Sequence, residues 1–365
     1  MRVLLSGTSN SIIADGISTV LARSPDVTQF RNASYGASGT VAIGDHLRGI
    51  DFAAHDVCII DYCVNEEVFL FQNLTALEDA LSNMFNMVDA ASRAGCLPVV
   101  LILPTQQRID RARPLEAGLL ERLRAFGVPF FNAYDHITAL GTRYGIVPDD
   151  LFMDANHIQR WLNKFIGQQI IAFLKGLDFT ALRLRETGQS YRPLAFLPHE
   201  RMAITGDSRI VAQESRLMTR EVVSLAPGAV MQLDLPAPCI LSGVTLNAAR
   251  SWGRLTQAES GAELFRTNVP SLFSAKRGLT LVSLPMPAPW QIGPGPARVR
   301  FEGLALAGPD RPEIRLELSG LILTLLDQDR PLAVLAPEGE GVCIDRQIDL
   351  AEEARLVQQA RAERG

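Results

Sequence analysis

One short stretch of the sequence places a carboxylate and an imidazole at a spacing that suits proton transfer. Asp154 and His157 stand three residues apart, directly before a helical pattern over about 158–175. At this spacing the aspartate can hold the Nδ1–H of the imidazole and leave Nε2 free as a base. The other four histidines lack such a carboxylate, and no pair of them has metal-ligand spacing. We read these four as surface or interface residues: His46, His55, His136 and His199.

A serine that could serve as the partner of this base follows the first expected strand. The segment 7–11, Gly-Thr-Ser-Asn-Ser, comes after the apolar run 2–6 and before a helical pattern that starts at Ile12. A tight strand-to-helix turn would present the Ser9 hydroxyl at the carboxyl edge of a parallel sheet, where open α/β sheets build their sites. Taken alone, the same polar residues are explained more simply as a helix cap.

Two further segments carry groups that could donate hydrogen bonds to a developing oxyanion. The segment 32–40 follows the expected second strand, and its glycines, Gly36 and Gly39, let backbone N–H groups approach a ligand closely. Asn65 follows the expected third strand, and its side-chain amide could donate to an oxyanion or cap the next helix. Each of these signals is weak by itself.

In their order along the chain, these four segments resemble the signature blocks of the SGNH/GDSL hydrolase superfamily. The resemblance covers about residues 1–175 and implies a flavodoxin-like, three-layer α/β/α fold. Gly39 is preferred to Gly36 because Ser38-Gly39-Thr40 matches the family's loop better. The implied roles are Ser9 as nucleophile, His157 as base, Asp154 orienting the base, and an oxyanion hole formed by the Ser9 amide, Gly39 and Asn65.

The sequence departs from the family pattern at two places. Thr8 replaces the usual aspartate before the nucleophile, and the Gly-x-Asn-Asp block is Cys63-Val64-Asn65-Glu66 here. Neither change removes a residue with an implied role, but both alter the floor of the pocket. Cys63 has no dedicated base nearby, so we interpret it as a buried strand-end cysteine. The literal Gly-Asp-Ser at 206–208 has no histidine after it and is predicted to be a turn.

Short apolar runs alternate with longer helical patterns over residues 1 to about 178, which is typical of a parallel sheet covered by helices. The run 99–103 is apolar throughout, as expected of a strand that is buried on both faces. The expected strands are 2–6, 57–62, 99–103 and 129–132, and the expected helices are about 12–23, 67–94, 115–126 and 158–175.

After about residue 178 the hydrophobic period changes to two, as in Ile314, Leu316 and Leu318, and Pro/Gly clusters separate the runs. This pattern predicts an all-β sandwich with a jelly-roll-like form. Its aromatic residues Trp252, Phe265 and Trp290 could stack on sugars, although a place in the core is the simpler interpretation. The expected parts are an SGNH-hydrolase-like α/β domain at 1–178, a linker at 179–196, the β-sandwich at 197–335 and a charged tail or helix at 336–365.

Composition excludes several functional classes. The 365 residues carry a net charge of −5 with no Lys/Arg run, so nucleic acid and anionic membranes are poor partners. Five scattered cysteines without a CxxC pair argue against a zinc site or a disulfide framework. No apolar run approaches the ~20 residues of a membrane span, and the N-terminal run is too short for a signal peptide. We expect a cytoplasmic protein without metal or cofactor, and leave homo-oligomer formation and removal of a signal peptide open.

Three functional hypotheses follow. The first is a serine esterase that forms an acyl-enzyme and acts on an ester, expected to be the O-acetyl group of a saccharide or a small molecule. The appended sandwich is the reason to expect a saccharide. The second is an O-acyltransferase that modifies a glycan precursor with the same triad. The third is a non-catalytic glycan-binding protein on a degenerate hydrolase fold.

Overall fold

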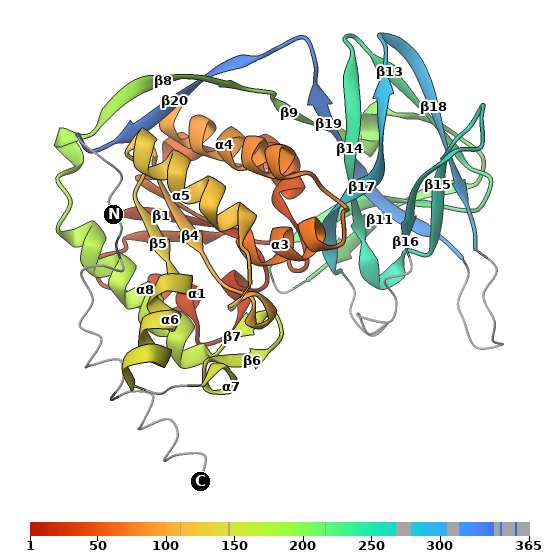
Figure 1. Cartoon of the computed structure of the whole chain (residues 1–365). Helices are drawn as coiled ribbons and strands as arrows, with labels where there is room; N and C mark the ends of the chain where they lie inside the picture. The colour runs from red at the N-terminus through yellow and green to blue at the C-terminus, as the bar shows by residue number, and fades with distance from the viewer. Residues whose placement is uncertain are drawn as a thin grey trace.

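A computed structural model of the chain describes residues 1–109, 111–144, 147–215, 217–267, 279–304 and 314–338, together with Ile344 and Arg355. It has two parts, an α/β part built from the N-terminal half and a β part that lies beside it (Figure 1). Apart from these two single residues, the tail predicted at 336–365 lies outside the described residues from position 339 onward. Within the described ranges, no helix is long and apolar enough to cross a membrane.

The α/β part is built on a five-stranded sheet in which every pair of neighbours is parallel. The strand order β2-β1-β3-β4-β5 is that of flavodoxin-like folds, which confirms the fold class expected from the sequence. Because parallel strands end at the same edge, the segments that follow β1 and β3 lie close together there. The strands are β1 (Arg2–Gly7), β2 (Gln29–Asn32), β3 (Val57–Asp61), β4 (Leu97–Ile102) and β5 (Phe130–Asn132).

Helices cover both faces of this sheet, as the alternation of side chains along its strands requires. Val99 and Leu101 of β4 pack in one core cluster with α1 and α8, whereas Val100 and Ile102 pack in another with α4 and α5. Strand β4 is apolar throughout because both of its faces are buried. The helices are α1 (Ile17–Arg23), α2 (Ile43–Gly49), α4 (Leu77–Arg93), α5 (Pro114–Phe126), α6 (Ala133–Tyr144), α7 (Pro148–Leu151) and α8 (Arg160–Lys175).

The structure corrects two of the expected helices. The helix predicted over 67–94 is divided into α3 (Cys63–Phe71) and α4, because Asn73 takes a φ of 55° in the left-handed region and ends α3. The helix predicted from residue 12 starts at Ile17, after a single 3₁₀ turn at Asn10–Ile12. The segment between β1 and α1 is therefore a compact loop that contains a single 3₁₀ turn, and Ser9 lies in this loop.

The β part is a sandwich of two antiparallel sheets, as predicted. One sheet has the order β10-β13-β18-β15-β16 and the other β11-β12-β19-β14-β17, with β9 paired to β19. Side chains from both sheets, such as Phe301 and Leu241, share one core cluster. The strands are β9 (Leu194–Pro198), β10 (Ala203–Thr205), β11 (Ser208–Glu214), β12 (Thr219–Leu225), β13 (Val230–Leu235), β14 (Cys239–Asn247), β15 (Gly253–Gln257), β16 (Glu263–Thr267), β17 (Leu281–Ile292), β18 (Gly295–Glu302) and β19 (Leu316–Leu325).

The segment 179–196, expected as a linker, contains a strand of its own. This strand, β8 (Arg183–Tyr191), pairs with β20 (Arg330–Ala336), and the two-stranded ribbon lies over α4 (Figure 1). Leu332 and Val334 of β20 are buried in the same cluster as the α4 side chains. The α/β core is thus completed by a strand that comes after the sandwich in the sequence.

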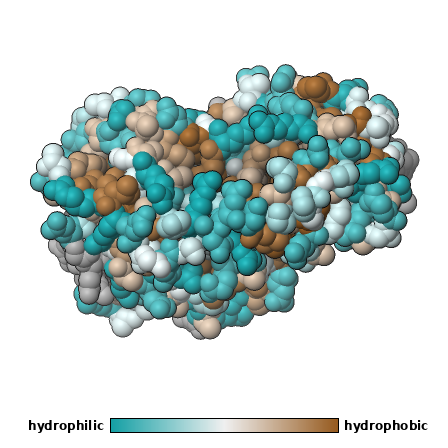
Figure 2. Space-filling view, turned by 90° about the horizontal axis from the view of Figure 1, so that it is seen from above, coloured by the Kyte–Doolittle hydropathy of each residue, from teal (hydrophilic) through white to brown (hydrophobic). Residues whose placement is uncertain are grey.

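A buried carboxylate fixes this ribbon to α4. Asp89 of α4 accepts hydrogen bonds from the Tyr191 hydroxyl at 2.8 Å and from the Ala333 amide at 2.7 Å. It also pairs with Arg93 one helical turn later. Seen from above the view of Figure 1, the surface is largely hydrophilic. Small apolar patches lie on both parts of the molecule and where the two parts meet (Figure 2).

Candidate active site

The structure brings Ser9, His157 and Asp154 into one chain of hydrogen bonds. His157 Nε2 lies 2.8 Å from Ser9 Oγ, and His157 Nδ1 lies 2.8 Å from each carboxylate oxygen of Asp154. Ser9 and His157 are separated by 148 positions in the sequence. The order serine, imidazole and carboxylate is that of a nucleophile, its base and the group that orients the base. The roles of the three residues in a reaction stay a prediction.

The Ser9 hydroxyl is not used to cap the turn that follows it. Ser9 stands at the start of the 3₁₀ turn, and its side chain makes no capping hydrogen bond, so the alternative of a helix cap is not realised at this residue. Its neighbour Asn10 is fully buried and contacts the histidine loop: Asn10 Nδ2 donates to the Asn156 carbonyl at 3.1 Å, and Asn10 Oδ1 accepts from the Ile158 amide. Sequence reasoning missed this residue, which joins the two loops of the site.

A tight hairpin formed by β6 (Phe152–Asp154) and β7 (His157–Ile158) positions the carboxylate and the imidazole. Asp154 Oδ1 accepts from the Asn156 amide at 2.9 Å and from the His157 amide at 3.0 Å. Partial burial acts to raise the pKa of Asp154, but the hydrogen bonds from the Asn156 amide and the His157 ring outweigh it and lower the pKa. The carboxylate is therefore ionised near neutral pH.

Ser9 and His157 open into a cavity of about 860 Å³ between the two parts of the molecule. The β part closes it with the β11–β12 turn and with residues at the start of β17. Polar and apolar side chains are mixed on this wall, which suits a ligand with both hydroxyl and apolar surfaces. The residues of the β part that line the cavity include Glu214, Ser215, Leu217, Met218 and Leu281.

The two glycines of the loop have different places. Gly36 lines the cavity together with Ala37, but Gly39 is not among the lining residues. A Cβ at Gly39 would stand 2.5 Å from Glu66 Oε2 and 2.7 Å from the Phe69 ring, so this glycine allows the loop to pack against α3. Gly36 thus lies at the cavity and Gly39 packs against α3, and the choice of Gly39 as the oxyanion donor stays a prediction.

Asn65 lies in the first turn of α3 and is 9% exposed at the cavity wall. The N-cap of α3 is Tyr62, so Asn65 is not the helix cap that the sequence left open. Asn65 Nδ2 donates one hydrogen bond, to the Ser38 carbonyl at 3.1 Å. An amide nitrogen carries two hydrogens, so a second one is available to a ligand.

Both departures from the family pattern lie behind the site. Glu66 is buried, and its Oε2 accepts from the Thr40 amide at 2.6 Å. This bond holds the loop that contains Gly36 and Gly39 against α3. Burial raises the pKa of Glu66 despite that amide. The Thr8 hydroxyl is buried, with no hydrogen-bond partner among the described residues.

Asp61, at the end of β3, accepts hydrogen bonds from residues on both sides of Ser9 in the sequence. It is fully buried, and the Ser11 hydroxyl donates to its Oδ2 at 2.7 Å. Burial raises the pKa of Asp61 to about 6, although the Ser11 hydroxyl and the Thr8 amide act in the opposite direction. Sequence reasoning named Asp61 only as part of a strand end.

This burial makes stability depend on pH. Ionised Asp61 is costly only in the folded protein, so its contribution is fully present below the ordinary pKa of 3.8 and is lost as pH rises through about 6. We expect the free energy of unfolding of Asp61→Asn, relative to wild type, to rise by about 3 kcal/mol between about pH 3.5 and pH 8. Urea unfolding at both pH values measures this, and a difference that does not change with pH contradicts it.

Several other candidates are structural residues. The four remaining histidines were interpreted as surface or interface residues; all four are buried, which corrects the surface alternative, and His136, for example, stacks on Phe165. Phe265 is in the sandwich core and Trp290 packs against it, as the simpler interpretation held. Burial raises the pKa of the Cys63 thiol well above its ordinary value, which disfavours a thiolate nucleophile. In the part of the chain that the structure describes, no group of His, Cys, Asp or Glu could hold a metal ion.

The Gly-Asp-Ser segment at 206–208 is a turn, as predicted. Gly206 has a φ of 97°, a conformation that glycine adopts without steric cost, and Ser208 begins β11 with its side chain exposed. Asp207 forms an ion pair with Arg315 of the sandwich. Ser208 is not among the residues that line the cavity at Ser9 and His157.

Comparison with known proteins identifies the fold. No family model and no curated protein sequence matches the chain. Two crystal structures of a two-domain esterase active on acetylated mannans align with it at 12% identity and a TM-score of 0.60. One, co-crystallised with mannopentaose, covers 90% of this chain and 92% of its own; the other covers 93% and 92%. A lipolytic protein of the G-D-S-L family from Desulfitobacterium hafniense aligns over 46% of this chain and 95% of its own, at 16% identity and a TM-score of 0.37.

The two alignments with the mannan-active esterase define the architecture of the molecule. The chain shares with that esterase a fold that extends over both parts, the three-layer α/β/α part and the β-sandwich. At 12% identity the likeness establishes the fold, and the chemistry has to be argued from the residues at the cavity.

Proposed function

We propose that this protein is a carbohydrate esterase that removes an O-acetyl group from a saccharide through an acyl-enzyme on Ser9. The observation that carries the proposal is the chain of hydrogen bonds from Ser9 Oγ through His157 to Asp154, which opens into the cavity between the two parts. A serine beside a base that is held by a carboxylate is the arrangement that activates a hydroxyl nucleophile.

The reaction has two stages. Ser9 Oγ attacks the ester carbonyl carbon while His157 Nε2 takes its proton, and the tetrahedral intermediate collapses when His157 returns that proton to the leaving sugar hydroxyl. Water then attacks the acyl carbon while His157 Nε2 takes its proton, and His157 returns that proton to Ser9 Oγ as the carboxylic acid leaves. Asp154 stays ionised in both stages and stabilises the imidazolium, in keeping with its lowered pKa.

Three groups at the cavity wall are proposed as donors to the oxyanion: the amide of Ser9, the amide of Gly36 and Nδ2 of Asn65. Gly36 takes the place that the sequence assigned to Gly39, because Gly36 lies at the cavity. Such a donor contributes roughly 3 kcal/mol to the transition state when it is aimed at the developing charge.

A saccharide is proposed as the alcohol part of the substrate for two reasons. The esterase with the same two-part fold is active on acetylated mannans and was co-crystallised with mannopentaose. Independently, the cavity wall offers the carboxylate of Glu214 beside the apolar Leu217 and Met218. Acceptors for sugar hydroxyls next to apolar side chains are what a sugar ring requires, since it has polar edges and less polar faces.

Trapping the acyl-enzyme tests this function. With 4-nitrophenyl acetate we expect a burst of nitrophenol and one acetyl group on the peptide that contains Ser9, followed by release of acetate. Acetylated mannan oligosaccharides should then compete with the aryl ester, and the same oligosaccharides without acetyl groups should compete less well. Mass spectrometry of the quenched protein and of the products measures both steps.

The outcomes separate the three hypotheses. Acetyl transfer to an added oligosaccharide in large excess over free acetate would assign the same residues to an O-acyltransferase. Binding of the oligosaccharide with no acetyl group on Ser9 and no turnover would contradict the esterase and favour a glycan-binding protein.

A further inference from the structure

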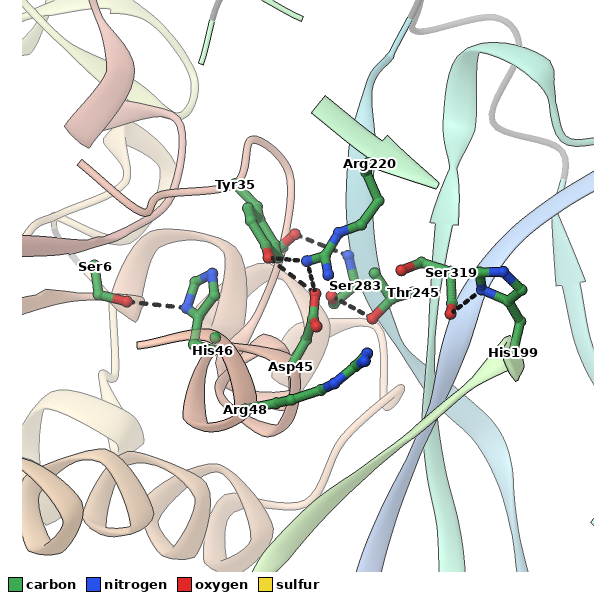
Figure 3. A network of polar contacts seen from close by, with 12 residues as sticks. Ser6, Tyr35, Asp45, His46, Arg48, His199, Arg220, Thr245, Ser283 and Ser319 are labelled. Carbon is green, nitrogen blue, oxygen red and sulfur yellow. Dashed lines mark hydrogen bonds and ion pairs between the residues drawn. The ribbon is translucent and has the colours of Figure 1, made fainter. Parts of the chain in front are cut away.

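An arginine of the sandwich reaches into the α/β part and forms a buried polar cluster there. Arg220, at the start of β12, donates from Nη2 to the Tyr35 hydroxyl and to Asp45 Oδ2, both at 2.7 Å (Figure 3). The Tyr35 hydroxyl donates in turn to Asp45 Oδ2 at 2.9 Å. Asp45 is 1% exposed and Tyr35 is 6% exposed, so these bonds are shielded from water and are stronger than surface contacts.

The residues that Arg220 contacts are close to the proposed reaction. Tyr35 immediately precedes Gly36, and both line the cavity with Ser9. The Tyr35 amide donates to the Gly7 carbonyl at 3.0 Å, two residues before Ser9. The position of Tyr35 therefore determines where the Gly36 amide lies relative to the nucleophile.

The same loop is held by the sandwich at two further points. The Ser38 hydroxyl accepts from the Ser283 amide of β17 at 2.9 Å, and Ala37 packs against the core of the sandwich. Ala37 has a φ of 54°, in the left-handed region, which is unfavourable for an L-residue. Such a conformation persists only where its surroundings fix it, and the sandwich supplies part of these surroundings.

Charge makes Arg220 the central contact of the three. Asp45 lies in the first turn of α2 with almost no contact with water, and Arg220 is the cation that pairs with it at 2.7 Å. The other charged or titratable groups that face this cluster are Arg48, Arg31, His46 and Glu200. Removing one partner of a buried ion pair leaves the other charge uncompensated, so the loss of Arg220 affects Asp45 and the Tyr35 hydroxyl together.

We propose that Arg220 is a positioning residue for acyl transfer: through Tyr35 it fixes the loop 33–39 so that the Gly36 amide is aimed at the oxyanion that forms on the ester bound at Ser9. The second domain is, on this view, part of the catalytic apparatus and does more than bind carbohydrate. This inference rests on the proposed function of Ser9.

Kinetics of two matched arginine variants test the inference. Arg220→Met should lower kcat for 4-nitrophenyl acetate about 10²-fold, since displacement of a group in the site by about 1 Å has that effect, with KM changed less than threefold. Arg48→Met is the control, because Arg48 also pairs across the two parts, with Glu200, but at 4.0 Å and with both side chains about half exposed. It should keep wild-type kcat.

Two further variants keep the test valid if Arg220→Met folds poorly. Asp45→Asn combined with Arg220→Met removes the buried charge together with its partner, and Tyr35→Phe removes only the hydroxyl contact. Each should lower kcat with little change in KM, and adding guanidinium ion to Arg220→Ala should restore part of the rate. Wild-type kcat in folded Arg220→Met, in the folded double variant or in folded Tyr35→Phe overturns the proposal.

Hydrogen–deuterium exchange separates failure of this inference from failure of the esterase proposal. Amides of residues 33–39 should exchange faster in Arg220→Met than in Arg48→Met, whether or not the wild type hydrolyses esters. An active wild type whose loop and rate are both unaffected by Arg220→Met overturns the positioning role alone. An inactive wild type whose loop responds to Arg220→Met overturns the esterase proposal and leaves Arg220 as the residue that orders the loop.

Discussion

Ser9→Ala should lower kcat for 4-nitrophenyl acetate by on the order of 10⁶-fold, because loss of the nucleophile removes the covalent route altogether. The substitution removes a single oxygen from a half-buried side chain that caps no helix, so the melting temperature should change little. Steady-state turnover and a thermal melt of both proteins measure the two expectations. KM is not informative here, since the residual reaction follows another path.

A second serine provides the matched control. Ser208→Ala removes the same atom from the literal Gly-Asp-Ser segment, whose serine is exposed on the sandwich. This variant should keep wild-type turnover. Turnover that survives in Ser9→Ala, or is lost in Ser208→Ala, contradicts the assignment of Ser9 as nucleophile.

Asp154→Asn should lower kcat by about 10⁴-fold with the fold intact. Asp154 Oδ1 accepts from the two amides of the hairpin and from His157 Nδ1, and asparagine can still accept from the amides through its carbonyl oxygen. Its NH₂ group would then face Nδ1, which favours the tautomer with the proton on Nε2 and prevents that nitrogen from taking the Ser9 proton. The loss should therefore appear in kcat, with KM changed much less.

The measurement is a comparison of Asp154→Asn with Asp149→Asn. Asp149 is a nearby carboxylate that bonds Gln106 and not the imidazole. Asp149→Asn should retain full activity. If the kcat of Asp154→Asn falls by less than about tenfold, the carboxylate does not orient the base. The imidazole must then be held by its backbone contacts alone.

The three residues of the candidate site were predicted from the sequence in two different ways. Asp154 and His157 lie in one hairpin, so their spacing alone predicts that they meet. Ser9 follows a strand, and the parallel order of the sheet brings that strand end towards later loops on the same edge. Its assignment as nucleophile came from the resemblance to the SGNH/GDSL hydrolases, because its segment alone is explained more simply as a helix cap.

Features that depend on how the two parts meet could not be found in this way. Arg220 contacts Tyr35 across 185 positions, and nothing in the spacing of either residue indicates the other. Within the α/β part, the place of Gly39 depends on its packing against the ring of Phe69 in α3. The start and the end of this helix were also predicted wrongly, because the expected helix ran over 67–94. Asn73 could have suggested the break in that helix, because asparagine adopts the left-handed conformation more readily than most residues.

The ribbon that lies over α4 has a consequence for how the protein is made. The Ala333 amide of β20 donates to Asp89 of α4 across 244 positions, and Leu332 and Val334 pack in the same core cluster as the α4 side chains. During synthesis, N-terminal domains generally fold as soon as they leave the ribosome. Here the α/β part cannot complete its core until the sandwich and β20 have been translated. One apolar side of α4 therefore stays uncovered until then. The nascent chain should therefore depend on chaperones for longer than its domain order suggests, and the two domains should become stable together.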